Sequence, residues 1–332
     1  MISEKAICEL LSDLLPTGRL NRCFESDAEI ICVNGGPCLF STDEFSAEDL
    51  FREADAYSLG WNIATGALSD ILACGGQPLY YAHALTVSPL WEMEYLDRFG
   101  CGVRDVLNAA GARFIGGDCG RSPLWRCTAS VIGSCEGPPV RRRGAASGDL
   151  IYLSGRIGAG NLEAALKLRA EVVPAWAHSL VNRFALRLPE SAIMRRHASA
   201  CIDTSDGVWS GLNCLGDLNG CGYEVADLPY HPAAVRVCEA VALPRIVLFL
   251  GECGEYELLF TVRPELEGSL LAEARETGCT FHRLGRVTPG ERRLRQDGRE
   301  FDLGSLRIQA RDYETPQRYF QDLSRWLEQQ LR

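Results

Sequence analysis

The chain has 332 residues, of which 46% are hydrophobic, and its formal net charge is −10. This length predicts two domains, with enough apolar residues for a packed core in each. The acidic balance argues against a nucleic-acid-binding surface, although the run RRR at 141–143 is a basic spot that could meet a phosphate. No apolar run approaches the roughly 20 residues that span a bilayer, and the N-terminus lacks a signal-peptide pattern, so we expect a cytoplasmic protein without membrane association.

Helices and strands alternate along the first part of the chain. Apolar residues at helical spacing predict a helix that begins at Ser3 and two longer helices over 53–73 and 91–110. The segment GGQP at 75–78 should end the first of the longer helices. Apolar runs predict strands at 29–33, 37–42, 79–87, 114–115 and 127–133. This alternation indicates an α/β architecture.

A domain boundary is expected at residues 136–139, where the sequence EGPP interrupts the pattern. We therefore predict an N-terminal domain over 1–138 and a C-terminal domain over 139–332. The second domain begins with a strand at 149–155 that runs into a glycine loop, followed by a helix capped by Asn161. A second helix should open at 205–207, and residues 258–262 read as a strand.

Several common enzyme signatures are missing. The glycine loop at 155–160 has the order G-x-x-G-x-G rather than G-x-G-x-x-G, and neither a Walker loop nor a G-x-S-x-G elbow occurs. The fifteen cysteines contain no C-x-x-C pair, so we expect most of them to be small buried hydrophobic residues. The five histidines show no pairing, and we assign them no catalytic role.

Short acidic segments are the most informative feature of the sequence. Each lies at the end of an apolar run or beside a glycine; their carboxylates are Asp27, Asp43, Asp70, Asp118, Asp203 and Asp206. Any one of them alone would more commonly be a turn residue or a helix cap. As a series, several at strand ends, they predict carboxylates gathered in one crevice. Hard oxygen ligands favour Mg²⁺ or Mn²⁺, and Mg²⁺ in such sites usually accompanies a nucleotide phosphate, so phosphoryl transfer is the leading chemistry.

The motifs around these carboxylates resemble those of the aminoimidazole-ribonucleotide synthetase-like (PurM-like) superfamily, and within it the thiamine-monophosphate kinases. The matching motifs are SDA at 26–28, STD at 41–43, ALSD at 67–70, GGD at 116–118, RRGA at 142–145, IDTSDG at 202–207 and GEYELLFT at 254–261. They occur in the same order and extend over about residues 5–320.

This resemblance implies two PurM-like α/β (α+β) domains, an ATP- and Mg²⁺-dependent kinase that converts thiamine phosphate to thiamine diphosphate, and a homodimer that pairs through N-terminal sheets. The residues that match Mg²⁺ ligands are Asp27, Ser41, Thr42, Asp43, Asp70, Asp118, Asp203 and Asp206. Those that match ATP contacts are Gly117, Asp118, Arg142 and Ser205. Asp70, Asp118 and Arg142 are the implied catalytic set, and Leu50 and Glu255 occupy positions implied to contact the small-molecule acceptor.

The departures from the family pattern concern the acceptor. Leu50 stands where these kinases have a histidine, Gly211 replaces an expected aspartate, and no tryptophan is evident near Tyr313. They suggest that the acceptor has changed and that thiamine phosphate is a poor substrate.

Two alternative functions stay open. Selenophosphate-synthetase chemistry needs a reactive N-terminal cysteine, whereas we expect Cys8 to be buried in the first helix. A non-catalytic nucleotide-binding subunit would gain nothing from a costly cluster of negative charge.

Overall fold

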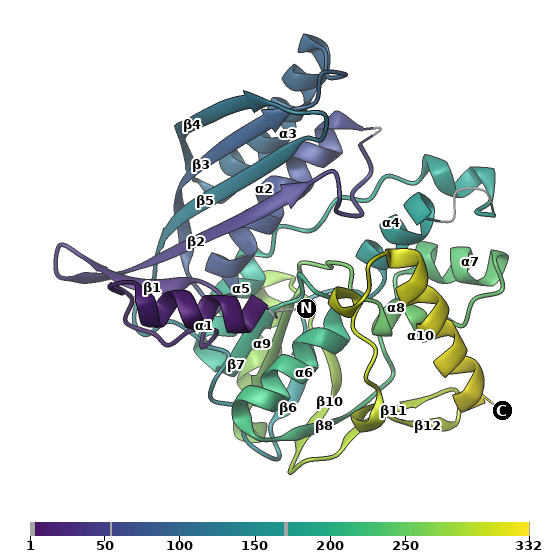
Figure 1. Ribbon diagram of the computed structural model, residues 1–332. Helices are drawn as coiled ribbons and strands as arrows, with labels where there is room; N and C mark the ends of the chain where they lie inside the picture. Colours follow the sequence, from purple (N-terminus) through teal and green to yellow (C-terminus); the bar gives the residue numbers. More distant parts are fainter. Residues whose placement is uncertain (1–3, 54, 169–171, 332) are drawn as a thin grey trace.

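The computed structural model describes residues 4–53, 55–168 and 172–331, and its strands form two separate sheets (Figure 1). The first sheet has the order β1-β2-β5-β3-β4, in which β3 and β4 run parallel and the other neighbours antiparallel. Its strands are β1 (Glu29–Val33), β2 (Gly36–Ser46), β3 (Gln77–Val87), β4 (Arg113–Arg121) and β5 (Arg126–Ser134). The helix α1 (Glu4–Leu14) precedes it.

Two long helices, α2 (Ala56–Ala73) and α3 (Met93–Ala110), cover one face of the first sheet. They pack closely because glycine lies at their contact: a Cβ on Gly60 would stand 2.1 Å from the carbonyl oxygen of Phe99, and one on Gly102 would stand 2.1 Å from that of Tyr57. The other face of the sheet exposes polar and aromatic side chains. Exposed residues on it include Thr42, Glu44, Tyr80, Ala84 and Asp118.

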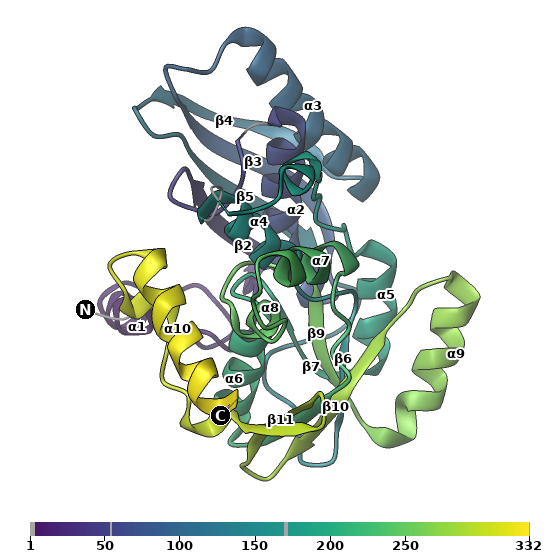
Figure 2. The same ribbon diagram turned by 90° about the vertical axis from the view of Figure 1, so that its right-hand side faces the viewer.

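The second sheet has the order β12-β11-β8-β10-β6-β9-β7, with only the β8–β11 pair parallel. Its strands are β6 (Leu150–Leu153), β7 (Ala198–Asp203), β8 (Gly222–Ala226), β9 (Leu258–Val262), β10 (His282–Thr288), β11 (Arg292–Gln296) and β12 (Arg299–Asp302). One face packs against α4 (Ala159–Leu168), α6 (Val208–Asn219), α7 (Pro232–Ala240), α8 (Val247–Leu250) and α10 (Pro316–Leu331). The opposite face packs against α5 (Leu188–His197) and α9 (Glu267–Thr277), as Figure 2 shows.

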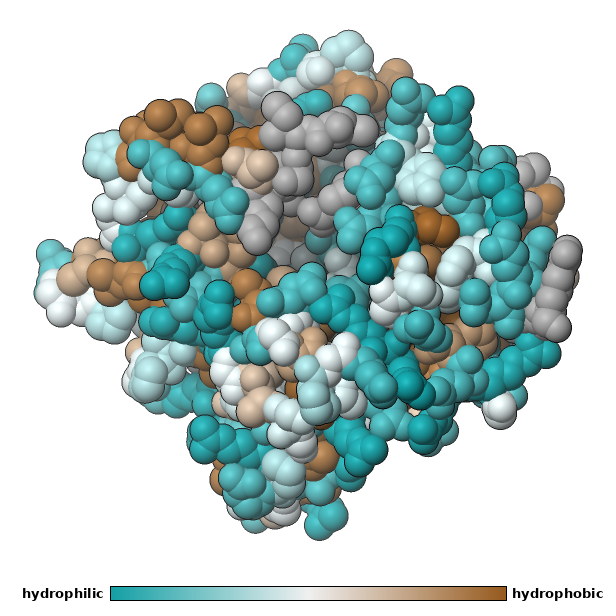
Figure 3. Space-filling model, turned by 60° about the horizontal axis from the view of Figure 1, so that its bottom comes forward, coloured by the Kyte–Doolittle hydropathy of each residue, from teal (hydrophilic) through white to brown (hydrophobic). Residues whose placement is uncertain are grey.

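The two parts of the molecule share a hydrophobic contact. Leu72 and Ala73, at the end of α2, are buried in the same cluster as Met194 of α5 and Phe260 of β9. The C-terminal end of α2 is therefore anchored in the second domain, and this contact fixes how the N-terminal sheet faces α6 and β7. Figure 3 shows that the surface seen from below is largely hydrophilic, with hydrophobic residues in scattered groups.

The expected elements of the first domain are present, with shifted ends. The helix expected from 53 begins at Ala56, because Asp55 caps it and accepts a hydrogen bond from the backbone N–H of Tyr57 at 3.2 Å. The strands of the first sheet end at Ser134 and those of the second begin at Leu150, with the expected boundary between them. None of the helices in the described part of the chain combines the length and apolar character that a membrane crossing requires.

The expectation that Asn161 caps α4 is wrong. Asn161 lies inside that helix and is buried, and its side chain donates to the carbonyl oxygens of Leu248 and Gly251, both at 3.1 Å. The asparagine thus joins α4 to α8 instead of beginning the helix.

Candidate active site

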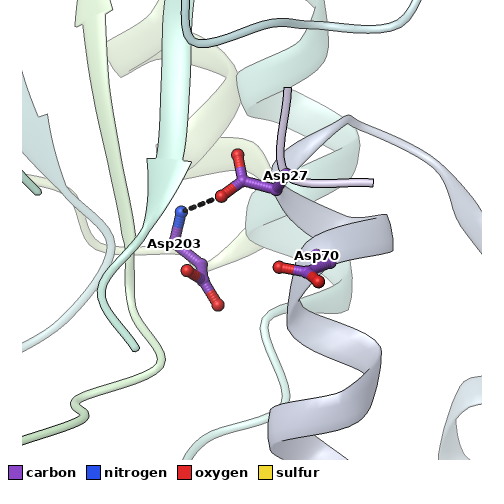
Figure 4. A group of neighbouring side chains, drawn as sticks. All are labelled: Asp27, Asp70 and Asp203. Atoms are coloured by element: carbon purple, nitrogen blue, oxygen red, sulfur yellow. Dashed lines mark hydrogen bonds between the residues drawn. The ribbon is translucent and has the colours of Figure 1, made fainter. Parts of the chain in front are cut away.

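Three carboxylates from distant parts of the chain meet where the two domains face each other (Figure 4). Asp27 precedes β1, Asp70 lies on α2, and Asp203 ends β7. One oxygen from each lies within 4.8 Å of the other two. The backbone N–H of Asp203 points to Asp27 Oδ1, at 3.4 Å, so the end of β7 is held against the segment before β1.

The cluster carries more negative charge than its surroundings balance. Burial, reinforced by the charges of Asp203 and Asp27, raises the pKa of Asp43 to about 7. Burial and the charge of Asp27 raise the pKa of Asp203 to about 6, and burial and Asp43 raise that of Asp70. Arg142 is the cation that contacts the group, with Nη2 at 2.8 Å from Asp27 Oδ1. The arrangement favours an added cation because the carboxylates otherwise repel one another.

Asp27 gives the clearest sign that the cluster suits a cation. Its side chain is 1% exposed, and Oδ1 accepts hydrogen bonds from Nε and Nη2 of Arg142. Its other oxygen, Oδ2, is buried and has no hydrogen-bond partner among the described residues. A buried carboxylate oxygen without a partner is costly, and a divalent cation between Asp27, Asp70 and Asp203 would satisfy it.

Serine hydroxyls fix the rotamers of the carboxylates. Ser41 donates to Asp70, Ser69 donates to Asp203, and Ser205 Oγ lies 2.9 Å from Asp203 Oδ1. Ser69 was not expected at the site, although it directly precedes Asp70. Ser69 lies beside Asp70 on the largely buried helix α2, and its hydroxyl reaches the carboxylate of Asp203 in the opposite domain.

The carboxylates open into a pocket of about 1180 Å³ between the domains. Beside them, aromatic rings line the wall: the ring centroids of Phe51 and Tyr256 are 6.4 Å apart, and those of Phe45 and Phe51 are 6.1 Å apart. Leu50 lies on the same wall. Cys8 also lines the pocket and is half-buried, so its expected burial inside the first helix is wrong.

Ser205 and Asp206 are exposed in the turn that precedes α6. Both line the pocket, as expected of site residues. Thr42 also borders the pocket, but its hydroxyl lies 3.0 Å from Ser130 Oγ on the exposed side of β2. Because side chains alternate along a strand, Ser41 and Asp43 face Asp70 while Thr42 faces away.

Gly117 and Asp118 do not join the carboxylate cluster within this chain. They lie on β4, three strands away from β2 in the sheet order, which is about 14 Å at the usual strand spacing. Asp118 is exposed, and its Oδ1 accepts a hydrogen bond from the backbone N–H of Cys119 at 2.8 Å. Within a single chain, Asp118 is therefore too far from the carboxylate cluster to act there.

Glu255 lies beneath the pocket and not on its wall. It is 2% exposed, and its carboxylate accepts hydrogen bonds from the backbone N–H groups of Gly158, Ala159 and Gly160 at 2.6, 2.8 and 3.2 Å. The carboxylate therefore caps the start of α4. The expected contact with the acceptor is wrong for this geometry, and Glu255 acts through α4 instead.

Comparison with known proteins agrees with this architecture. Residues 25–135 match the N-terminal domain of AIR synthase related proteins. The thiamine-monophosphate kinase of Halobacterium salinarum is 32% identical over 299 residues, which cover 90% of this chain and 96% of that protein. The thiamine-monophosphate kinase of Escherichia coli K12 is 34% identical over 259 residues, covering 75% and 78%. The solved structure of AaThiL complexed with AMPPCP and TMP has a TM-score of 0.76 at 23% identity, covering 91% of this chain and 95% of that one.

The two sheets, the carboxylates between them and the matched N-terminal domain define a two-domain protein of the PurM-like, AIR synthase-related fold class, which confirms the expected fold. Within that class the identity and coverage are decisive. The chain belongs to the thiamine-monophosphate kinase family.

Proposed function

We propose that this protein transfers the terminal phosphoryl group of ATP to thiamine phosphate, with Mg²⁺ held by the carboxylates between its domains. The observation that carries the proposal is the meeting of Asp27, Asp70 and Asp203 within 4.8 Å in a pocket that two domains enclose. Relatives named for this activity are identical to the chain at about a third of the aligned residues.

The residues present fit Mg²⁺. All candidate ligands are oxygen donors, which this ion prefers, and Asp27 Oδ2 is buried without a partner. Asp27, Asp70 and Asp203 would hold a first ion, with Asp43 beside them and Asp206 at the entrance. Bound Mg²⁺ supplies charge that offsets the negative triphosphate and the phosphoryl group in transfer.

Arg142 and the turn before α6 are suited to binding the negatively charged nucleotide. Arg142 is fixed by Asp27, so its guanidinium is positioned beside the carboxylates without loss of side-chain freedom on binding. Ser205 lies in the turn before α6, whose N-terminus favours negative groups. No side-chain nucleophile is needed, because positioning and charge stabilisation account for catalysis of this reaction class.

A homodimer is part of the proposal. Tyr80 and Ile115 are 43% and 58% exposed on β3 and β4, and Asp118 lies near them on β4. Pairing of two such faces would bury these apolar groups and would bring Gly117 and Asp118 of one chain toward the other copy. We also place the enzyme in the cytoplasm, since its fifteen cysteines are all unpaired thiols and ATP is its co-substrate.

The aromatic wall is the proposed acceptor site. Phe51 and Tyr256 offer ring faces on which a cationic heterocycle can stack, with the buried Phe45 packed against Phe51 and the carboxylates at one end of the pocket. Leu50, in place of a histidine, changes one side of this wall. Gly211 lies against Leu259: a Cβ on Gly211 would stand 3.0 Å from Leu259 Cδ2, so a larger side chain would crowd the core.

The test is a product assay with thiamine phosphate, ATP and Mg²⁺. Because relatives named for this activity are 32–34% identical, we give up the expectation that thiamine phosphate is a poor substrate and expect thiamine diphosphate to form with kcat/KM of about 10⁴ M⁻¹s⁻¹ or more. Unphosphorylated thiamine is the control acceptor, because a site built for the phosphate should reject it. ATP binding without any thiamine diphosphate would show that the acceptor has changed, as the substitution at Leu50 suggests.

A further inference from the structure

The loop at residues 47–53, here called the acceptor loop, joins β2 to α2 and carries part of the pocket wall. It contributes Glu48, Asp49, Leu50 and Phe51 to the lining. The loop forms no helix or strand of its own. Its position therefore comes from contacts with neighbouring elements. Two are within its own domain: the N–H of Ala47 donates to the carbonyl oxygen of Trp125 at 3.1 Å, and the hydroxyl of Tyr95 donates to that of Glu53 at 2.7 Å.

Further contacts, which reach the charged side chains of the loop, come from the opposite domain. Arg52, in the acceptor loop, forms a two-point ion pair with Glu163 on α4: Nε bonds to Oε2, and Nη2 lies 2.8 Å from Oε1. The same guanidinium donates to the carbonyl oxygens of His178 and Leu180. We call Arg52, Glu163 and these two carbonyl groups the Arg52 clasp.

The two charged side chains of the Arg52 clasp are largely shielded from solvent. The Glu163 side chain is 6% exposed and that of Arg52 is 22% exposed. A planar guanidinium held at both oxygens of a carboxylate is specific in direction as well as charge. Lys167, one turn further along α4, reinforces it: Nζ lies 3.0 Å from the carbonyl oxygen of Ala47 and also bonds to that of Asp49.

The two elements of the C-terminal domain that carry the clasp, α4 and the segment around His178, are themselves held in place. Glu255 caps the start of α4, and the segment after His178 is fixed to α2, where Trp61 Nε1 lies 2.8 Å from the carbonyl oxygen of Phe184. Arg142 and Ser205, in contrast, make their side-chain bonds to Asp27 and Asp203. The clasp therefore contacts the acceptor wall and stands apart from the groups assigned to the nucleotide.

We propose that the Arg52 clasp positions the acceptor loop, so that Arg52 and Glu163 set the affinity for the phosphate acceptor without contributing to the nucleotide site. Both are positioning residues, and the inference rests on the proposed function. Because α4 belongs to the C-terminal domain, the acceptor wall is complete only while α4 and the acceptor loop are joined.

The test uses the full-length Arg52→Gln and Glu163→Gln variants. We expect the KM for thiamine phosphate to rise at least about tenfold in each, while the KM for Mg·ATP stays within about twofold, because a lost ion pair at the loop affects only the group it positions. Arg52→Lys keeps the charge but loses the fork, and should give an intermediate KM. Arg195→Gln is the matched control, since Arg195 pairs with Glu136 at 2.7 Å outside the pocket.

Hydrogen exchange of the acceptor loop gives a second measurement that does not depend on turnover. Peptides that cover 47–53 should exchange faster in Arg52→Gln than in the wild type and in Arg195→Gln. Equal increases in both KM values, or unchanged exchange and unchanged KM for thiamine phosphate, would overturn the proposal. If the wild type does not phosphorylate thiamine phosphate, the proposed function fails, and loop exchange alone decides whether the clasp exists.

Discussion

Asp70 shows how a single side chain can be unfavourable for folding and necessary for binding. It is half-buried among Asp43, Asp203 and Asp27, and its desolvation together with these charges raises its pKa. Asp70→Asn removes one charge from the cluster and keeps the shape. We expect the metal-free variant to melt at the same temperature as the wild type or higher, while ATP turnover falls by about 10²-fold or more.

Thermal unfolding in EDTA and steady-state kinetics check this prediction together. Asp105→Asn is the control for the amide substitution, because Asp105 is on α3 and hydrogen-bonds to Tyr57 at 2.8 Å, away from the pocket. A destabilised Asp70→Asn protein with normal turnover would mean that Asp70 is a structural residue of α2.

The raised pKa values of Asp43 and Asp203 make the effect of Mg²⁺ depend on pH. In the folded metal-free protein these pKa values are about 7 and about 6, whereas in the unfolded chain both are ~4. Between those values the native state holds more protons than the unfolded state, so this contribution to stability is complete below ~pH 4 and is lost as pH rises to about 7.

Mg²⁺ held at the proposed site would bind the deprotonated carboxylates and so reverse the loss. We expect the rise in melting temperature on adding Mg²⁺ to be small at about pH 5.5 and large at about pH 8. Differential scanning calorimetry with Mg²⁺ and with EDTA at both values measures it. A rise that is equal at the two pH values would show that Asp43 and Asp203 are not the groups that bind the ion.

At the level of residues, the sequence could identify the carboxylates but not all of their roles. Asp27, Asp70 and Asp203 stand out in the sequence because each is an acidic residue at the edge of an apolar segment. A carboxylate in such a place either faces a crevice or is buried at a cost in free energy, and the structure brings these three together. Glu255 has the same signal, yet it caps α4. A backbone cap and a ligand look alike in sequence, because both place a carboxylate at a chain turn.

At the level of elements, the contact between α2 and α3 depends on glycine. A Cβ on Gly102 would stand 2.1 Å from the carbonyl oxygen of Tyr57 and 2.7 Å from the backbone nitrogen of Trp61. Gly102→Ala should therefore destabilise the protein by ~1–3 kcal/mol, since backbone cannot move aside as a side chain can. Gly100, on the same helix, differs in that a Cβ there would have no atom of the described residues within 4 Å.

Gly100→Ala is thus the internal control and should stabilise α3 by up to ~1 kcal/mol. Denaturant unfolding of both variants measures the two free energies of unfolding. If Gly102→Ala is as stable as Gly100→Ala, the helices are free to separate and the glycine contact does not fix α2.

Elements with a strong apolar pattern were predicted well, and charged ones were not. The strands expected at 29–33 and 258–262 agree with β1 and β9, whose residues include long apolar runs. The strand β11 (Arg292–Gln296) was not expected, because its sequence RRLRQ reads as a solvated surface. Leu294 is its buried residue, and Arg293 and Arg295 pair with Glu300 and Glu224 of the neighbouring strands. Such a strand is defined by its partners rather than by its own pattern.

For the whole molecule, the two sheets differ in how they are covered. Helices pack on both faces of the second sheet, whereas the first has helices on one face and exposes Tyr80 and Asp118 on the other. A dimer through this face would explain why Asp118, which matches a ligand position in sequence, lies outside the cluster of its own chain. Sequence alone cannot separate a ligand of the same chain from one supplied by a second copy.

This arrangement predicts complementation between two inactive variants. If Asp118 completes the site of the partner copy, Asp118→Asn and Asp70→Asn chains that exchange in one solution form mixed dimers with one intact site each. We expect turnover to return to about one quarter of the wild-type value, because half of randomly formed dimers are mixed and each has half of its sites intact. Adding Tyr80→Glu to both chains places a charge on the exposed face, so it should yield monomers by sedimentation and abolish the recovery. No recovery from stable mixed dimers would mean that Asp118 does not act across the interface.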